Sequence, residues 1–209
     1  MSAIIFASIC PHPPIILPSV GSKEDRAMAK KTIESLEFLG KELCLTRLST
    51  IVRLIVISSP HEDWGFNVPL YFLAPDFKRE IKRYVTGEES PAFHLEKGRK
   101  TYKEIIARGS ILNKIALIAS GDLSHCLKKD GPYGFHPHGG KFDQDLIKYL
   151  KNKDIGRLIK LDEDYPEAGE CGLRSICFIL GILEESNINY APEMLSYEGP
   201  WGVGYLVAN

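Results

Sequence analysis

Residues 114–125 read KIALIASGDLSH, and this stretch says most about the fold. Residues 114–119 form an almost entirely apolar run, which predicts a strand buried on both faces of a sheet. The run ends in the polar loop Ser120-Gly121-Asp122-Leu123-Ser124-His125. A buried strand that leads into a polar loop with a histidine is typical of the carboxyl edge of a parallel sheet, where α/β proteins bind ligands.

Two other stretches end in the same way. Residues 3–9 (AIIFASI) lead into the loop CPHPP, which contains His12, and residues 53–58 (RLIVIS) lead into SPHED, which contains His61. One histidine near a strand end is more often a hydrogen-bonding loop residue, but parallel neighbouring strands would bring all three to one edge. Imidazole is the commonest metal ligand. We therefore expect a metal or catalytic site at this edge, formed by His12, His61 and His125.

The rest of the chain alternates between strand and helix patterns. Residues 22–48 have apolar residues at helical spacing, which predicts an amphipathic helix that breaks near Gly40. Further helices are expected at 98–108, 142–151 and 168–185, and further strands at 67–73, 190–197 and 203–208. This order predicts an α/β three-layer sandwich with a mostly parallel or mixed central sheet flanked by helices. No repeat or linker divides the chain, so we expect one domain over residues 1–209.

Composition and charge exclude several classes of function. The formal net charge is -1 and no basic stripe is present, so neither nucleic acid nor an anionic membrane surface is an expected partner. No apolar run approaches the ~18 residues of a membrane span, and the first ten residues lack the basic region of a signal peptide. The five cysteines are scattered without a CxxC pair, which disfavours a zinc knuckle and predicts a reducing, cytoplasmic setting.

The sequence pattern does not decide which residue is the third metal ligand. A zinc hydrolase or a non-heme iron(II) site would add a carboxylate to the histidines, and a thiolate would make a softer site. Asp122 can instead cap the turn that follows it, and Glu170 lies at a predicted helix start, where the helix dipole stabilises a carboxylate. Cys171 is the soft alternative beside Glu170. The other acidic candidates are Glu62, Asp63 and Glu167.

Two glycine-rich segments could border such a site. Residues 131–140 (GPYGFHPHGG) form a loop that can fold over the site, which makes Tyr133 a candidate for substrate contact. His136 and His138 in this loop are interpreted as surface groups, and His94 has no companion. Residues 197–205 (YEGPWGVGY) are interpreted as a turn into a last strand, with Trp201 closing the core.

Several of these motifs together resemble the class III extradiol ring-cleavage dioxygenases, specifically their catalytic B-type subunit (LigB-like). The related Memo proteins share the fold of this superfamily. The resemblance covers nearly the whole chain. The motifs that carry it are PHPP at His12, SPH at His61, SGDLSH ending at His125, DGPYG at residues 130–134 and GVGY at residues 202–205.

The resemblance implies a site with iron(II) bound by two histidines and one glutamate. His12 and His61 would be the histidines, and Glu170 the glutamate, with Cys171 as the alternative third ligand found in Memo-like proteins. Zinc, copper or manganese are alternative metals. His125 would be the catalytic acid and base.

The expected substrates are a small aromatic diol and O2, with Asp122 and Tyr133 in substrate binding. The competing hypothesis is a Memo-like protein that binds metal without ring cleavage and works with a partner protein. A second copy of the chain, forming a homo-oligomer, and a small partner subunit are both possible protein partners.

Overall fold

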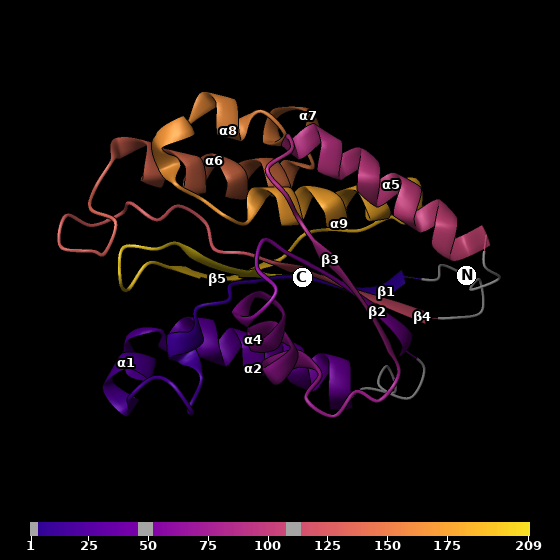
Figure 1. Ribbon diagram of the computed structural model, residues 1–209, viewed down its shortest axis with the longest axis horizontal. Helices are drawn as coiled ribbons and strands as arrows, with labels where there is room; N and C mark the ends of the chain where they lie inside the picture. The colour runs from indigo at the N-terminus through magenta and orange to yellow at the C-terminus, as the bar shows by residue number, and fades with distance from the viewer. Residues whose placement is uncertain (1–3, 46–51, 108–113) are drawn as a thin grey trace.

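A computed structural model describes residues 4–45, 52–107 and 114–209, and it contains a six-stranded sheet between two layers of helices (Figure 1). The strand order is β3-β2-β4-β1-β6-β5. This arrangement confirms the predicted α/β sandwich with a mixed sheet. The strands are β1 (Ile4–Cys10), β2 (Val52–Ser59), β3 (Glu80–Val85), β4 (Lys114–Ser120), β5 (Met194–Glu198) and β6 (Tyr205–Ala208).

The helices divide between the two faces of the sheet. One layer holds α1 (Lys23–Met28), α2 (Lys30–Leu45) and α4 (Trp64–Leu73) (Figure 1). The opposite layer holds α5 (Pro91–Ala107), α6 (Pro137–Asn152), α7 (Ile155–Leu158), α8 (Leu161–Asp164) and α9 (Leu173–Glu185). Short 3-10 turns cover Pro14–Ile16 and Pro166–Ala168. No helix in the described ranges is long and apolar enough to cross a membrane.

Strand β4 lies at the centre of a parallel block, and this places the candidate site. Strands β1 and β2 both pair in parallel with β4, on opposite sides of it, while β6 and β5 add an antiparallel edge. Cys10 pairs with Ser120, and Ser58 pairs with Ala119. The carboxyl ends of the three strands therefore lie side by side, and the loops that follow them begin at one edge of the sheet.

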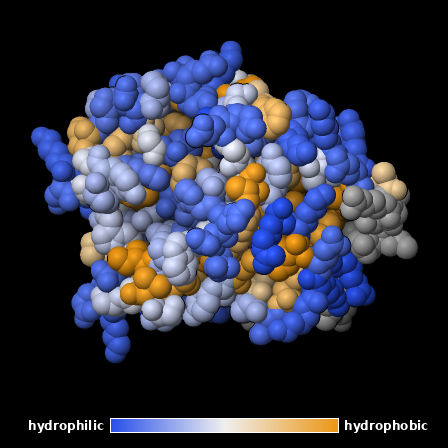
Figure 2. Space-filling model, viewed as in Figure 1, coloured by the Kyte–Doolittle hydropathy of each residue, from blue (hydrophilic) through white to orange (hydrophobic). Residues whose placement is uncertain are grey.

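The apolar strands are covered on both faces, as their sequences predict. Nearly every residue of β2 and β4 is buried, and two apolar clusters fill the spaces between the sheet and the two helical layers. In the space-filling view, hydrophilic residues cover the outer helices, and hydrophobic residues show mostly between the helical layers (Figure 2). Helix α2 approaches α4 closely at Gly40, where an added Cβ would lie 2.1 Å from the Phe72 carbonyl oxygen.

Two elements differ from the sequence-based expectation. Residues 67–73, expected as a strand, belong to helix α4. The spacing of apolar residues cannot distinguish a short buried strand from a short buried helix. Here the segment is a helix that packs against the sheet. Strand β3 was not expected, because its sequence EIKRYV is largely charged, which suits an exposed sheet edge.

Other boundaries shifted. The helix expected at 168–185 begins at Leu173, after a 3-10 turn, and the closing strands are shorter than expected. The helix expected at 22–48 does not break at Gly40, since α1 gives way to α2 at Ala29. The ends of three expected elements, at residues 3, 46–48 and 108, lie outside the described residues.

Candidate functional site

Three strand ends deliver the candidate residues to one place. His12 follows β1 by two residues, His61 follows β2 by two, and Asp122 and His125 follow β4. The rings of His12 and His61 have centroids 5.3 Å apart at an interplanar angle of 72°. The register of the central strands therefore brings together the two histidines that the sequence singled out.

Cys171 completes a compact group of donor atoms. One ligand atom from each of His12, His61 and Cys171 lies within 4.8 Å of the others, and His12 Nε2 is 3.7 Å from Cys171 Sγ. Asp122, His125 and Cys171 form a second, overlapping group. Imidazole nitrogens with a thiolate or carboxylate are a donor set that suits divalent transition metals, so these residues fit such an ion.

A proline in helix α4 sets the orientation of the His12 ring. Pro69 lies inside the helix and has no N–H, so the Gly65 carbonyl four residues earlier lacks its usual helical donor. The Ser120 hydroxyl donates to this carbonyl instead. A hydroxyl has one proton, so Ser120 Oγ must accept from His12 Nδ1, which lies 3.0 Å away. The His12 proton is thus held on Nδ1, and Nε2 presents its lone pair toward Cys171.

Burial dominates the electrostatics of the site. Desolvation, helped by the nearby His61, lowers the pKa of His12 to about 3, so its ring is neutral at neutral pH. Burial also raises the pKa of Asp122 to about 6, although its carboxylate accepts the His12 backbone N–H at 2.9 Å. Burial raises the pKa of the Cys171 thiol well above its ordinary value.

Backbone contact between two glycines brings Cys171 to the strand ends. A Cβ on Gly121 would lie 2.2 Å from Gly172 Cα, so neither position has room for a side chain in this contact. The Asp122 N–H donates to Cys171 Sγ and the Cys171 N–H donates to the Asp122 carbonyl, both at 3.4 Å. The loop after β4 therefore fixes the position of the residue that precedes helix α9 by two.

Glu170 points elsewhere. Its carboxylate accepts the Leu173 N–H at 2.6 Å and lies 3.3 Å from the Arg174 guanidinium, in the first turn of α9. Burial raises the pKa of Glu170 to about 7. The structure thus brings Cys171, not Glu170, to the two imidazoles. Consecutive side chains leave the backbone in different directions. Here the side chain of Glu170 turns to the start of helix α9 and accepts a backbone N–H there.

A cavity of about 650 Å³ opens above these groups. His125 lies on its wall, with its ring centroid 5.1 Å from that of Tyr133. The His125 Nε2 atom is buried and has no hydrogen-bond partner among the described residues, and burial lowers the pKa of this ring. Tyr133 is 65% exposed at the mouth. Asp122 and Tyr133, both expected in substrate binding, line the cavity.

The other histidines of the glycine-rich loop serve the start of helix α6. His136 occupies the N-cap position, where its Nδ1 accepts the His138 N–H at 3.2 Å. Neither ring lines the cavity. His94, which has no other histidine near it in the sequence, is buried against Tyr84. The Tyr84 hydroxyl lies 3.2 Å from His94 Nδ1.

Several residues of the site had no signal in the sequence strong enough to find them. Nothing in the sequence pattern indicates that Ser120 supports His12 or that Trp64 lines the cavity. Trp201, expected to close the core, packs against one of the two apolar clusters and also lines the cavity. The Gly202 and Gly204 carbonyls accept backbone N–H groups of the loop after β4, and this pairing carries the aromatic segment to the site.

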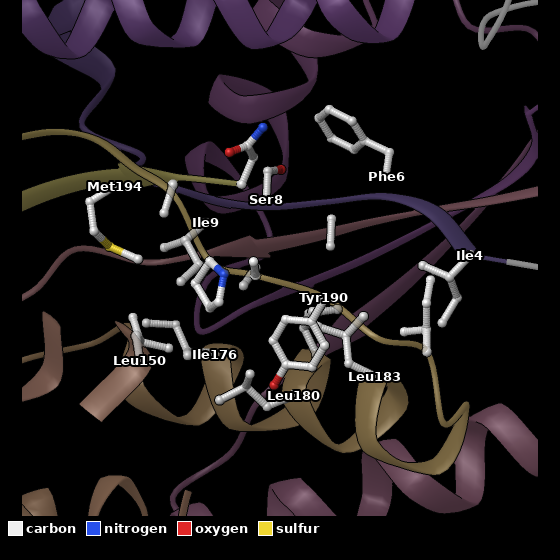
Figure 3. Close-up of a pocket in the computed structure, with 18 of the residues that line it drawn as sticks. Ile4, Phe6, Ser8, Ile9, Leu150, Ile176, Leu180, Leu183, Tyr190 and Met194 are labelled. Atoms are coloured by element: carbon white, nitrogen blue, oxygen red, sulfur yellow. The ribbon is translucent and has the colours of Figure 1, made fainter. Parts of the chain in front are cut away.

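A second cavity, of about 360 Å³, has a different character. It lies between β1, helix α9 and the segment before β5, and Figure 3 shows apolar side chains such as Ile4, Leu180 and Met194 around it. No histidine or cysteine lines it in the described part of the chain. The described residues around it are mostly apolar, and its few polar members, such as Ser8 and Glu42, form no metal-ligand group.

Comparisons with known proteins show the family of the chain. Residues 51–208, which include His61, His125 and Cys171, match the family described as the catalytic LigB subunit of aromatic ring-opening dioxygenase. Protein CA_C1420 of Clostridium acetobutylicum is 30% identical over 263 aligned positions, which cover 95% of this chain and 56% of that protein. The chain thus spans about half the length of this relative.

A solved structure shows the same fold. The crystal structure of the uncharacterized protein JW3007 from Escherichia coli K12 aligns with a TM-score of 0.63 at 16% identity. The alignment covers 97% of this chain and 98% of that chain. At this level of identity the likeness concerns the fold alone.

Proposed function

The chain belongs to the family of the catalytic LigB subunit of aromatic ring-opening dioxygenases, and on this premise we propose that it is an iron(II)-dependent extradiol dioxygenase of catechol-like aromatics. The observation that carries the proposal is the meeting of His12, His61 and a third donor under a cavity that His125 borders. A cavity of about 650 Å³ lies in the range of small-molecule sites. In this proposal residues 1–209 act as one catalytic domain.

Each group has a distinct task in the proposed reaction. His12 and His61 would hold the ion, with Cys171 or Glu170 as the third ligand. Bound there, iron(II) would lower the pKa of a catechol hydroxyl and hold the aromatic ring and dioxygen together. His125, on the cavity wall, would accept a hydroxyl proton with its imidazole and return it later. Asp122 and Tyr133 contact the ring substrate at the cavity wall.

The direct test is oxygen uptake after anaerobic iron loading. With a catechol present, the iron-loaded protein should consume oxygen and give a coloured ring-opened product. His125→Ala should keep the bound iron and lose most turnover, by ~10²-fold or more, as expected on removal of a general acid and base. Iron-loaded protein that consumes no oxygen with any of a panel of catechols would refute the proposal.

The position of Cys171 favours a second candidate function. A thiolate in place of a carboxylate makes a softer site, which suits reduced copper or zinc better than the iron(II) of a site with two histidines and one carboxylate. The chain would then be a Memo-like metal-binding protein that works with a partner protein and cleaves no ring. Metal binding by His12, His61 and Cys171, without oxygen uptake on any catechol, is the result that this candidate predicts.

A further inference from the structure

The cavity that would receive the ring has an uneven distribution of charge. Among the described residues that line it there is no lysine or arginine, whereas two acidic residues, Asp63 and Asp122, do line it. Aromatic and apolar side chains form most of the remaining wall. Lys128 follows the cavity residue His125 by three positions in the sequence, but it does not line the cavity. Its ammonium group donates to the Pro200 carbonyl oxygen.

Asp63 is an exposed carboxylate without a structural task in its helix. It occupies the N-cap position of α4, where an aspartate normally accepts a backbone N–H of the first turn. Its side chain accepts none, and the first-turn amides of Phe66 and Asn67 bond to its main-chain carbonyl. Asp63 lines the cavity beside Trp64, which is 46% exposed.

From this distribution we infer that the site selects aromatic diols whose remaining substituent is uncharged or cationic, and that Asp63 determines this specificity. The inference rests on the proposed function and names the substrate class of that site. A ring carboxylate that enters the cavity loses water and finds no lysine or arginine to pair with, while Asp63 repels it. An ammonium substituent would be attracted by the Asp63 carboxylate and by the aromatic rings of Trp64, Tyr133 and Trp201, which also line the cavity.

Direct binding measurements test the selectivity apart from turnover. Both tryptophans of the chain, Trp64 and Trp201, line the cavity, so quenching of their fluorescence reports occupancy. Iron-loaded protein is titrated anaerobically with methyl-, aminomethyl- and carboxy-substituted catechol. We expect the carboxy compound to bind about tenfold more weakly than the other two, with a difference that narrows as salt is added.

Two matched variants assign the effect to Asp63. Asp63→Asn should reduce the preference for the aminomethyl over the carboxy compound by roughly threefold or more, as expected for one charge at a solvated cavity mouth. Asp76→Asn removes the same charge from an exposed position that does not line the cavity, and it should leave the preference unchanged.

The outcomes separate the inference from the function on which it rests. Carboxycatechol that binds as tightly as methylcatechol would overturn the selectivity, even if oxygen uptake is normal. Equal effects of the two asparagine variants would overturn the role of Asp63. If no catechol quenches the tryptophans or consumes oxygen, the proposed function fails, and the inference fails with it.

Discussion

Removal of the Ser120 hydroxyl should weaken metal binding through the orientation of His12. Ser120 Oγ accepts from His12 Nδ1 at 3.0 Å and donates to the Gly65 carbonyl that Pro69 leaves free. In Ser120→Ala the ring loses the partner that keeps its proton on Nδ1. Loss of such a supporting hydrogen bond typically costs 10–100-fold in metal affinity, about 1.4–2.7 kcal/mol.

The assay combines metal affinity with the protonation of the ring. Competition with a chelator gives the dissociation constant for iron(II) or zinc, and ¹⁵N NMR of the metal-free protein shows which nitrogen of His12 carries the proton. Ser120→Thr keeps a hydroxyl and should restore both properties. Ser58→Ala removes another buried hydroxyl of the same sheet, one that bonds Ser175 rather than a histidine, and controls for lost stability.

Two results would contradict this reasoning. Unchanged metal affinity in Ser120→Ala would show that the serine does not support His12. A His12 proton that stays on Nδ1 in Ser120→Ala would show that another group sets the tautomer. Neither result depends on whether the protein cleaves catechols.

Two further predictions concern the third ligand and the response to pH. Cys171→Ser should weaken metal binding by tenfold or more, whereas Glu170→Gln should affect it less because that carboxylate caps α9; metal loss in Glu170→Gln alone would assign the ligand to the glutamate. Burial lowers the pKa of His94, so below its ordinary value of about 6.5 the unfolded chain binds a proton that the folded protein does not. Stability should therefore fall as the pH drops through this range, by up to about 1.4 kcal/mol per pH unit for this group, and urea unfolding of His94→Gln should show a smaller slope; an unchanged slope would exclude the effect.

The sequence predicted the fold class well because the central strands are decided locally. Each of β1, β2 and β4 is a short apolar run bounded by a polar loop, and burial on both faces requires this composition. The predicted secondary structure was wrong in the segments whose conformation depends on tertiary contacts. Residues 67–73 are as apolar as a strand and became helix α4, and charged β3 forms at the sheet edge because β2 offers it a partner.

The sequence by itself determined which residues could reach the site. Histidines lie within five residues of the ends of three apolar strands, and parallel adjacent strands bring such loops to one edge, so His12, His61 and His125 could be named without coordinates. The family resemblance followed from the same motifs, and the family match to residues 51–208 agrees with it.

The tertiary structure alone decided which neighbouring groups complete the site. Whether Cys171 or Glu170 faces the imidazoles depends on the contact of Gly121 with Gly172, two residues far apart in the sequence. Likewise, Pro69 affects His12 only because α4 lies against the end of β4. Strand formation follows from local composition, but the direction of a side chain follows from backbone contacts between distant segments, and no local pattern records those contacts.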